Sequence, residues 1–443
     1  MEPAQHRGFG FAAQILSLFI AALFLEGSAF PEERPTLDRY RTEAPDTLAA
    51  TVPKALRDRV TADPERKLPD LVAFLVKGTD DPFLKVKRIH DWIALNIGYD
   101  TSVPYGGTPP QQHWATVLAE RKGVCSGYSN LFEKMAELAG FECEAVGGYA
   151  RGTDYDLFTE AETAKDNHAW NAVKIGEQWY FADCTWDAGT VEQSGYTPRY
   201  STGFLFLEPE KMIFSHFPAK ETFQLLPQPV SREAFLNLPP LRGNFFGYCL
   251  SLETNMERIT AAGERFEFTV RAPDIVLVTV ALYEHGGMEL KNRTFVQKTG
   301  TGAKVSVLFP RQGEWVVKLF ARRLDSAKSE YTWCADFGFL SSKGTDTRFP
   351  SCYAIFQERG CVLHAPLMSP LKMGSKVTLR VTAPGARNAA VELRGKLTLF
   401  DRTSEKDTFD KTITVPLARE LIIVAQFEES GSFAGLVRFE VGQ

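Results

Sequence analysis

The sequence lacks the features that would give the chain a strong global charge or a dedicated cation site. Its 443 residues carry a formal net charge of -5, and no long basic run is found. This balance argues against nucleic acid as the main partner and against attachment to a membrane through a polybasic surface. Residues 151–166 contain Asp154 and Asp156 but not the ordered ligand spacing of an EF-hand-like calcium loop. Nothing in the sequence suggests a metal or an organic cofactor.

Long hydrophobic runs are limited to the N-terminus, where the residues from about Ile15 to Leu25 are apolar. Small residues follow at Gly27 to Ala29, a pattern typical of a secretory signal peptide covering residues 1–29. The apolar stretch is shorter than the roughly 20 residues that a membrane-spanning helix needs, so an uncleaved anchor is the less favoured alternative. We expect no membrane span in the mature chain, and a secreted, periplasmic or cell-surface protein.

Cysteine is scarce, and its count is odd. The seven cysteines lie at positions 125, 143, 184, 249, 334, 352 and 361. An odd number in a secreted chain leaves at least one thiol without an intramolecular partner. If the other six formed three disulfides, Cys125 would be the free thiol, although the sequence does not determine the pairing.

The N-terminal half predicts helices followed by short strands. Residues 30–69 are rich in proline and charged side chains, and predict a solvated lead-in with room for one helix. A core helix is expected after Asp81, a capping residue followed by a proline that suits the first helical position. A second amphipathic helix is predicted from Gly123 to Ala139, with Cys125 at its N-terminal end. With the short strands that follow, residues 70–235 read as an α+β domain.

Beyond Pro239 the sequence changes to many short strands rich in Val, Phe and Thr. The stretch "YCLSLETNMERITAAGERFEFTVRAPDIVLVTVALYE" resembles the later stretch "GCVLHAPLMSPLKMGSKVTLRVTAPGARNAAVELRGKL". This internal repeat predicts two all-β sandwich modules, at residues 240–345 and 350–443. Neither contains a convincing catalytic cluster, so we interpret both as spacers or as binding modules for a protein or cell-surface ligand.

The chemistry-bearing residues lie between these two regions. A cysteine nucleophile needs a base, and the base needs an orienting group, because the thiolate is the reactive form. The stretch "DNHAWNAVKIGEQWYFADCTWDAG" supplies His168 in one predicted strand and Asp183 in the next. A two-residue hairpin loop at Gly176 and Glu177 would place His168 and Asp183 on one face as diagonal neighbours. A register slip of one residue would put them on opposite faces.

The position of Cys125 at a helix start adds to this hypothesis, since the positive end of the helix dipole stabilises a thiolate. Cys125 would attack an amide or ester carbonyl, His168 would pass the proton to the leaving group, and Asp183 would hold the imidazole. An acyl-thioester enzyme would result, to be released by water or by an amine. The alternative interpretation of Cys125 is a buried, inert thiol.

The motifs "GVCSGYSNLF", "NHAWNAVKI" and "WYFADCTWDAG", in this order, resemble the transglutaminase-like superfamily, whose papain-like core carries a Cys-His-Asp triad. The stretches "KVKRIHDWIALNIGYD" and "GFLFLEPEKMIFSHFPAKETFQLL" are similar to the kyphoscoliosis peptidase branch and its bacterial relatives. The resemblance implies Cys125 as nucleophile, His168 as base and Asp183 as orienting group. It also implies an α+β papain-like domain followed by two Ig-like sandwich modules.

Five further residues are expected to support or line the site. They are Trp114, Tyr128, Trp170, Trp186 and His216. No glutamine could be assigned as a side-chain oxyanion donor, because Gln111 and Gln112 lie at an uncertain distance upstream. We therefore expect backbone N–H groups and Trp114 to take that role.

Three functions remain open from the sequence. The first is a secreted thiol hydrolase that acts on peptide or isopeptide bonds of a protein or peptide substrate. The second is a cross-linking transglutaminase, which uses the same nucleophile but transfers the acyl group to an amine. The third is a catalytically silent binding protein that acts through its β modules.

Overall fold

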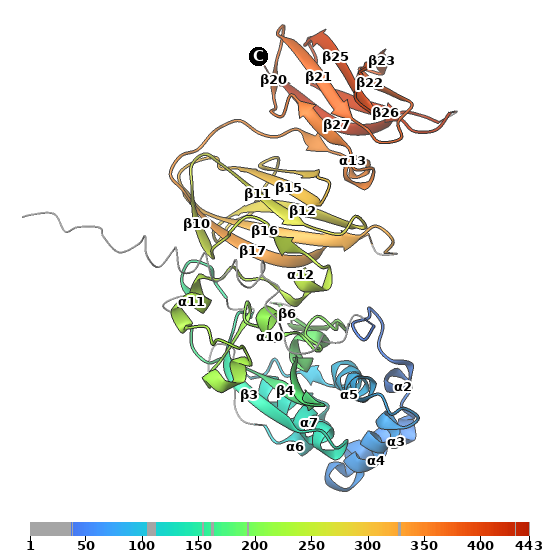
Figure 1. Ribbon diagram of the computed structural model, residues 1–443, viewed down its shortest axis with the longest axis vertical. Coiled ribbons are helices and arrows are strands. Elements are labelled where there is room, and N and C mark those ends of the chain that lie inside the picture. Colours follow the sequence, from blue (N-terminus) through green and yellow to red (C-terminus); the bar gives the residue numbers. More distant parts are fainter. Residues whose placement is uncertain are drawn as a thin grey trace, which may run out of the picture. The chain divides into compact units, whose positions relative to one another are not determined.

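The computed structural model describes residues 37, 39–103, 112–152, 155–160, 164–192, 195–326, 329–429 and 431–442. The chain forms two compact units, Met1–Gly243 and Asn244–Gln443 (Figure 1). The predicted signal peptide at residues 1–29 lies outside the described residues, so it stays a prediction. Within the described ranges, no helix is long and apolar enough to cross a membrane.

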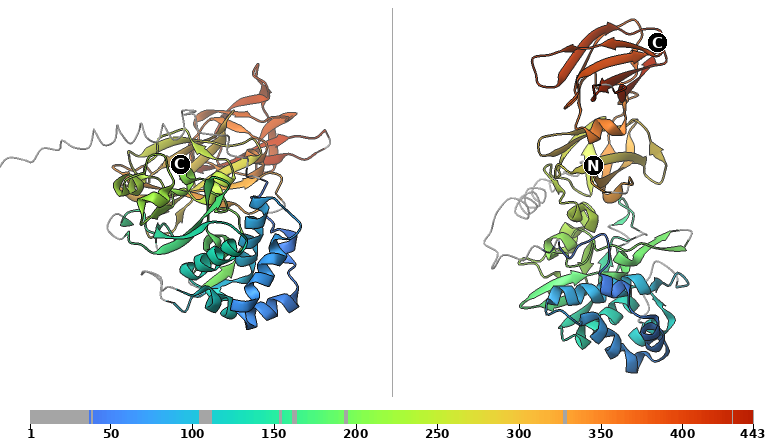
Figure 2. Two further views of the ribbon diagram at one scale, coloured as in Figure 1. Left: turned by 60° about the horizontal axis from the view of Figure 1, so that its bottom comes forward. Right: turned by 90° about the vertical axis from the view of Figure 1, so that its right-hand side faces the viewer.

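The first unit begins with a group of helices that pack side by side, drawn in blue in Figures 1 and 2. The helices of this unit are α2 (Thr47–Ala50), α3 (Lys54–Ala62), α4 (Pro64–Val76), α5 (Pro82–Asn96), α6 (Trp114–Glu120), α7 (Cys125–Leu138), α9 (Cys184–Ala188), α10 (Pro209–Met212) and α11 (Arg232–Asn237), with a 3-10 turn η1 (Glu221–Gln224). Helix α12 (Gly243–Gly247) lies at the boundary between the units.

The expectation of a solvated lead-in over residues 30–69 is wrong for the part of it that the structure describes, residues 37 and 39–69. Helices α2 and α3 and the start of α4 occupy this segment, and Leu56, Val60 and Leu68 are buried in the core of the unit. The high content of proline and charge conceals the helical spacing of these apolar residues, whose charged neighbours face solvent. The segment is therefore part of the folded unit.

The two helices predicted from sequence are confirmed. Asp81 caps α5, because its carboxylate accepts the backbone N–H groups of Phe83 and Leu84. Helix α7 begins at Cys125, and after it Gly140 adopts a φ of 88°, a left-handed conformation that glycine tolerates at a helix end.

A four-stranded antiparallel sheet of order β5-β4-β3-β8 packs against α7. The strands of the unit are β1 (Gly98–Tyr99), β2 (Lys122–Gly123), β3 (Cys143–Ala150), β4 (His168–Ile175), β5 (Gln178–Ala182), β6 (Gly189–Glu192), β7 (Gly195–Pro198) and β8 (His216–Pro218). The predicted hairpin register is confirmed from Ile175 paired with Gln178 to Asn171 paired with Ala182, and Gly176 in the loop has a φ of 62°. The predicted continuation of the second strand through Asp183 is wrong, because β5 ends at Ala182 and Asp183 caps α9. Asn171 of β4 donates to the Ser129 carbonyl of α7 at 3.0 Å, which fixes the helix on the sheet.

The second unit starts with a pair of facing sheets, of orders β10-β17-β16-β12-β13 and β14-β15-β11-β9. Their strands are β9 (Ser251–Leu252), β10 (Ile259–Ala262), β11 (Arg265–Arg271), β12 (Val276–Glu284), β13 (Glu289–Leu290), β14 (Thr294–Lys298), β15 (Gly302–Leu308), β16 (Gly313–Arg323) and β17 (Thr332–Ser341). The rings of Phe268 on β11 and Phe337 on β17 lie 5.4 Å apart, so the two sheets share a core.

A second pair of sheets completes this unit, with orders β18-β27-β26-β22-β23 and β19-β21-β25-β24, while β20 pairs with β27. The elements are β18 (Ser351–Cys352), α13 (Ala354–Glu358), β19 (Val362–Ala365), β20 (Leu371–Lys372), β21 (Lys376–Thr382), β22 (Asn388–Leu393), β23 (Lys396–Leu399), β24 (Asp401–Arg402), β25 (Thr408–Thr414), β26 (Glu420–Gln426) and β27 (Ala434–Gly442). Leu379 of β21 and Ile423 of β26 are both fully buried in one core.

All seven cysteines, each of which lies in the described part of the chain, are free thiols. The three disulfides considered from the sequence are therefore absent from this structure. Cys249 and Cys352 are exposed, whereas the other five cysteines are buried.

Candidate active site

Cys125 is the first residue of α7, and its side chain lies inside the unit, with 2% of the residue exposed. The preceding residue, Val124, is the N-cap and supplies no side-chain acceptor to the helix start. The positive end of the α7 dipole is therefore left to act on the adjacent sulfur, where it favours the thiolate.

His168 connects Cys125 to Asp183. Its Nε2 atom lies 2.7 Å from Asp183 Oδ2, and the Cys125 thiol is close enough to the ring to act on its pKa. Burial disfavours the charged imidazole, but the Asp183 carboxylate and the contact with Cys125 outweigh it and raise the pKa of His168 to about 10. The His168 ring therefore holds a proton at neutral pH.

Asp183 is completely buried and has two separate tasks. Its Oδ1 atom accepts the N–H groups of Thr185 and Trp186 at 2.9 and 3.1 Å and so caps the short helix α9, while Oδ2 faces His168. Burial alone would raise the pKa of this carboxyl, but the charge and hydrogen bond of His168 hold it below its usual range. Asp183 therefore stays anionic.

A second histidine meets the same carboxylate. His216, the first residue of β8, lies with Nε2 3.2 Å from Asp183 Oδ2 and with Nδ1 2.8 Å from the Ser215 hydroxyl. Burial lowers the pKa of His216 to about 4, even though Asp183 acts in the opposite direction. This ring is therefore neutral at pH 7.

Aromatic rings enclose the two histidines; we call Trp170, Trp186 and Phe204 the aromatic wall. Trp186 stacks on His168 with 5.1 Å between ring centroids, and its ring lies 4.4 Å from that of His216. Trp170 contacts His216 edge-on at 4.8 Å, and Phe204 does so at 5.4 Å. The aromatic wall keeps His168 and Asp183 in a low-dielectric setting, where the electrostatic interaction between them is strengthened.

The remaining two predicted supporting residues, Tyr128 and Trp114, pack in or against the core of the unit. Tyr128 is fully buried in the core, and its hydroxyl donates to the Ile97 carbonyl at 2.6 Å, which is a structural contact. Trp114 begins α6, packs on the same core and has the His113 ring at 5.2 Å.

Gln112, which the sequence could not assign, lies beside the start of α7. Its Oε1 atom accepts the Val124 N–H at 2.7 Å, and its carbonyl accepts the Asn130 side-chain amide, also at 2.7 Å. A Cβ atom at Gly127 would come within 2.5 Å of Oε1, so this close approach requires glycine. The glutamine is thus fixed next to the residue that precedes Cys125. No local sequence pattern could have found this contact, because it depends on the path of the chain between residues 112 and 124.

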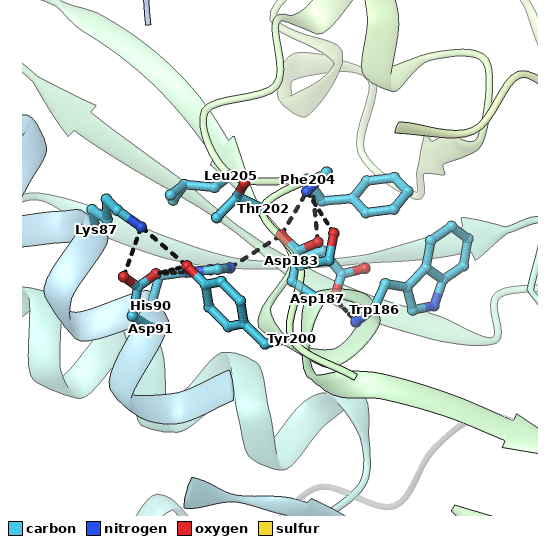
Figure 3. Close-up of polar contacts among 12 residues, drawn as sticks. Lys87, His90, Asp91, Asp183, Trp186, Asp187, Tyr200, Thr202, Phe204 and Leu205 are labelled. Atoms are coloured by element: carbon cyan, nitrogen blue, oxygen red, sulfur yellow. Dashed lines mark hydrogen bonds and ion pairs between the residues drawn. The ribbon is translucent and has the colours of Figure 1, made fainter. Parts of the chain in front are cut away.

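A second group of polar and charged side chains lies between α5 and α9 (Figure 3). We call this group the buried ion network; it consists of Lys87, His90, Asp91, Asp187 and Tyr200. His90 bridges Asp91 at 3.0 Å and Asp187 at 3.1 Å, while Lys87 bonds to Asp91 at 2.7 Å. The two carboxylates overcome the effect of burial and raise the pKa of His90 to about 9.

This network reaches the site through Asp187, which lies on α9 one turn after Asp183. Its carboxylate accepts the backbone N–H of Phe204 at 3.0 Å, and Phe204 belongs to the aromatic wall (Figure 3). The network therefore ties helix α5 to the segment that carries Asp183 and to the wall.

The nitrogen and oxygen atoms of His168, Asp183 and His216 lie within 4.8 Å of one another, a donor set that could hold a transition metal. A metal ion there would have to displace the proton shared by His168 and Asp183. The 2.7 Å separation of those two groups is that of a charge-assisted hydrogen bond, which accounts for the arrangement without an ion.

Comparison with known proteins agrees with this arrangement. Residues 69–184 match the transglutaminase-like superfamily, and residues 232–350 match the KY-like, immunoglobulin-like domain. Kyphoscoliosis peptidase from Mus musculus is 29% identical over 274 residues, which cover 60% of this chain and 40% of that protein. The Homo sapiens protein of the same name is 28% identical, with the same coverage. Hillarin from Drosophila melanogaster is 26% identical over 43% of this chain and 25% of its own length.

The matches give this chain a transglutaminase-like domain followed by an Ig-like domain. More particularly, the chain is similar to kyphoscoliosis peptidase, as its sequence motifs predict. The predicted fold class is confirmed. The matched part is 40% of the length of the two kyphoscoliosis peptidases, so the activity of those whole proteins does not transfer directly.

Proposed function

We propose that the transglutaminase-like domain is a thiol hydrolase that cleaves peptide or isopeptide bonds through Cys125, His168 and Asp183. The observation that carries this proposal is the continuous contact from the Cys125 thiol through the His168 ring to Asp183, with 2.7 Å between the last two groups. Reactive cysteines need this combination of a proton acceptor, an orienting anion and a helix start.

The reaction follows from the positions of these groups. The Cys125 thiolate attacks the carbonyl carbon, a carbon–sulfur bond forms, and the carbon–nitrogen bond breaks as the leaving amine takes the proton from His168. A water molecule then gives its proton back to His168 and attacks the thioester, which releases the acid and the thiolate. Asp183, which stays anionic throughout, keeps the imidazole aligned.

Gln112 is the side chain that we assign to the developing oxyanion. Because its Oε1 atom is held by the Val124 N–H, its amide orientation is fixed one residue away from the nucleophile. The amide NH₂ group, a fixed donor in a site shielded from water, can stabilise negative charge on the substrate oxygen. This assignment replaces the role considered for Trp114.

Acyl transfer to an amine is the second candidate, and the burial of the nucleophile favours it. Only 2% of Cys125 and 9% of His168 is exposed, so the thioester would be shielded from bulk water. Incubation with a labelled primary amine and a glutamine-containing peptide distinguishes the two reactions. Incorporation of the label indicates transfer, whereas release of acid alone indicates hydrolysis.

The test of the shared chemistry is the pH dependence of Cys125 alkylation, followed by mass spectrometry of the Cys125 peptide so that the exposed thiols Cys249 and Cys352 do not contribute. We expect alkylation of Cys125 at pH 6 in the wild-type protein, at a rate that falls about 100-fold in His168→Ala. Asp183→Asn should show a smaller loss. A profile in wild-type protein that does not depend on His168 would refute the catalytic role, leaving a binding function for the β modules.

We further propose that the protein is exported, on the basis of the hydrophobic run before Ala29. The N-terminal sequence of protein recovered from a secreting host tests this, and the expected first residue is Phe30. An intact Met1 would contradict it.

A further inference from the structure

Asp183 Oδ2 has two imidazole partners, and the structure gives them unequal distances. Nε2 of His168 lies at 2.7 Å and Nε2 of His216 at 3.2 Å. Hydrogen bonds between ionised groups are shorter than those with a neutral donor. The distances therefore place the positive charge on His168 and leave His216 as a neutral donor to the same oxygen.

The surroundings of His216 support a single protonation state. A carboxylate only accepts hydrogen bonds, so the His216 proton lies on Nε2, and Nδ1 can then accept the Ser215 hydroxyl at 2.8 Å. A second positive charge would sit with its ring only 5.6 Å from the protonated His168 ring, and the His216 side chain is wholly buried. Both conditions disfavour an imidazolium at this position.

The ring of His216 also has no room to turn. Its strand, β8, pairs with β3 so that His216 lies opposite Ala150, and Trp170, Trp186 and Phe204 surround the ring. The N–H donor is therefore presented to Asp183 in one orientation. With Oδ1 bound to the N-terminus of α9, all parts of the carboxylate are then fixed.

We propose that His216 is a positioning residue of the site: as a neutral second partner of Asp183 it fixes the carboxylate and leaves the mobile proton to His168 alone. This inference rests on the proposed function, in which that proton is the one given to the leaving group. It makes the working unit a set of four residues, Cys125, His168, Asp183 and His216, in which only His168 exchanges protons.

The consequence of losing the donor can be stated in advance. In His216→Phe the ring volume remains, but Asp183 loses one of its four hydrogen bonds and concentrates its negative charge on His168. The pH at which His168 releases its proton should then rise by about one unit. In His216→Gln packing is poorer, but the amide N–H can still donate to Asp183, so most of the wild-type titration should be retained.

The experiment is a titration of the full-length protein labelled with ¹⁵N in its histidine rings, together with the alkylation profile of Cys125. In wild-type protein we expect His216 with one protonated nitrogen, Nε2, from pH 6 upward, and we expect the His168 midpoint to shift in His216→Phe but not in His216→Gln. Phe204→Leu, which alters the aromatic wall without touching Asp183, is the matched control and should leave the midpoint in place. If His216 acted only through packing, His216→Gln would shift the His168 midpoint more than His216→Phe.

Two results would overturn the inference: two protonated nitrogens on His216 of the wild-type protein at pH 7, or a His168 midpoint in His216→Phe equal to that of wild type. The first needs no variant, so the inference stays testable even where His216→Phe does not fold. These outcomes are distinct from failure of the proposed function, which is read from the dependence of Cys125 alkylation on His168.

Discussion

The catalytic side chains differ in how many hydrogen bonds they make to the rest of the unit. The Cys125 thiol interacts with the His168 ring, whereas Asp183 receives hydrogen bonds from two backbone groups and two imidazoles. Substituting the thiol should therefore leave the fold intact, while substituting the carboxylate should affect both chemistry and stability.

A substitution of Gln112 should affect acylation of Cys125 but not its alkylation, because only acylation requires an oxyanion to be stabilised. Displacement of a halide from a small alkylating agent forms no oxyanion, whereas attack on an ester does. Gln112→Ala should lower the rate of the acylation burst with a p-nitrophenyl ester by about 100-fold and change the alkylation rate little.

Trp114→Phe is the control for this measurement, since it removes the indole N–H that the sequence had suggested for the same role. An acylation rate that falls in Trp114→Phe and not in Gln112→Ala would restore the original assignment.

The chemical identity of the central residues could be predicted from the sequence because local order determines it. Cys125 begins an amphipathic helix, and the hairpin register places His168 near Asp183. Gln112, Phe204 and the buried ion network contact the site from segments that lie outside the local motifs of Cys125, His168 and Asp183. No local periodicity encodes such distances, so these residues could not be assigned before the fold was known.

Helix α9 is short but connects several parts of the site. It has five residues, yet Asp183 caps it, Trp186 supplies part of the aromatic wall, and Asp187 joins the buried ion network. A helix this short is not stable by itself, so its geometry depends on these contacts. The sequence predicted the flanking strands but not this turn, because its stabilising partners His90 and Phe204 lie on other elements.

His90 provides a test of that dependence through pH. Its pKa is raised from 6.5 to about 9 in the folded protein, so its stabilising contribution is complete below about pH 6.5 and is lost as pH rises through 9. His90→Gln should remove a contribution on the order of 3 kcal/mol at pH 6 and little at pH 10.

The measurement is urea unfolding of the wild type and the variant at both pH values. The difference between the two proteins matters, because His168 also has a raised pKa and titrates in the same direction. A difference in stability that is equal at both pH values would contradict the assignment of an imidazolium to His90.

At the level of the whole chain, the contacts divide into Met1–Gly243 and Asn244–Gln443. All residues of the proposed site and of the buried ion network belong to the first unit. The change from mixed helix and strand to strands alone near residue 240 was readable from sequence, because the period of the apolar residues changes there.

This division predicts two separable unfolding transitions in calorimetry. His90→Gln should lower the midpoint of only one of them, and that transition should be the one monitored by accessibility of the buried Cys125 thiol. A single transition shifted as a whole would show that the units unfold together.

The double duty of Asp183 affects how activity should be judged across relatives. A lineage that abandoned the chemistry would still be selected to keep this carboxylate, since α9 needs its cap and the two histidines need their anion. Its presence in a related sequence therefore reports on folding. The thiol at position 125 has no comparable architectural duty, and its loss would be the earliest mark of a protein that has turned from catalysis to binding.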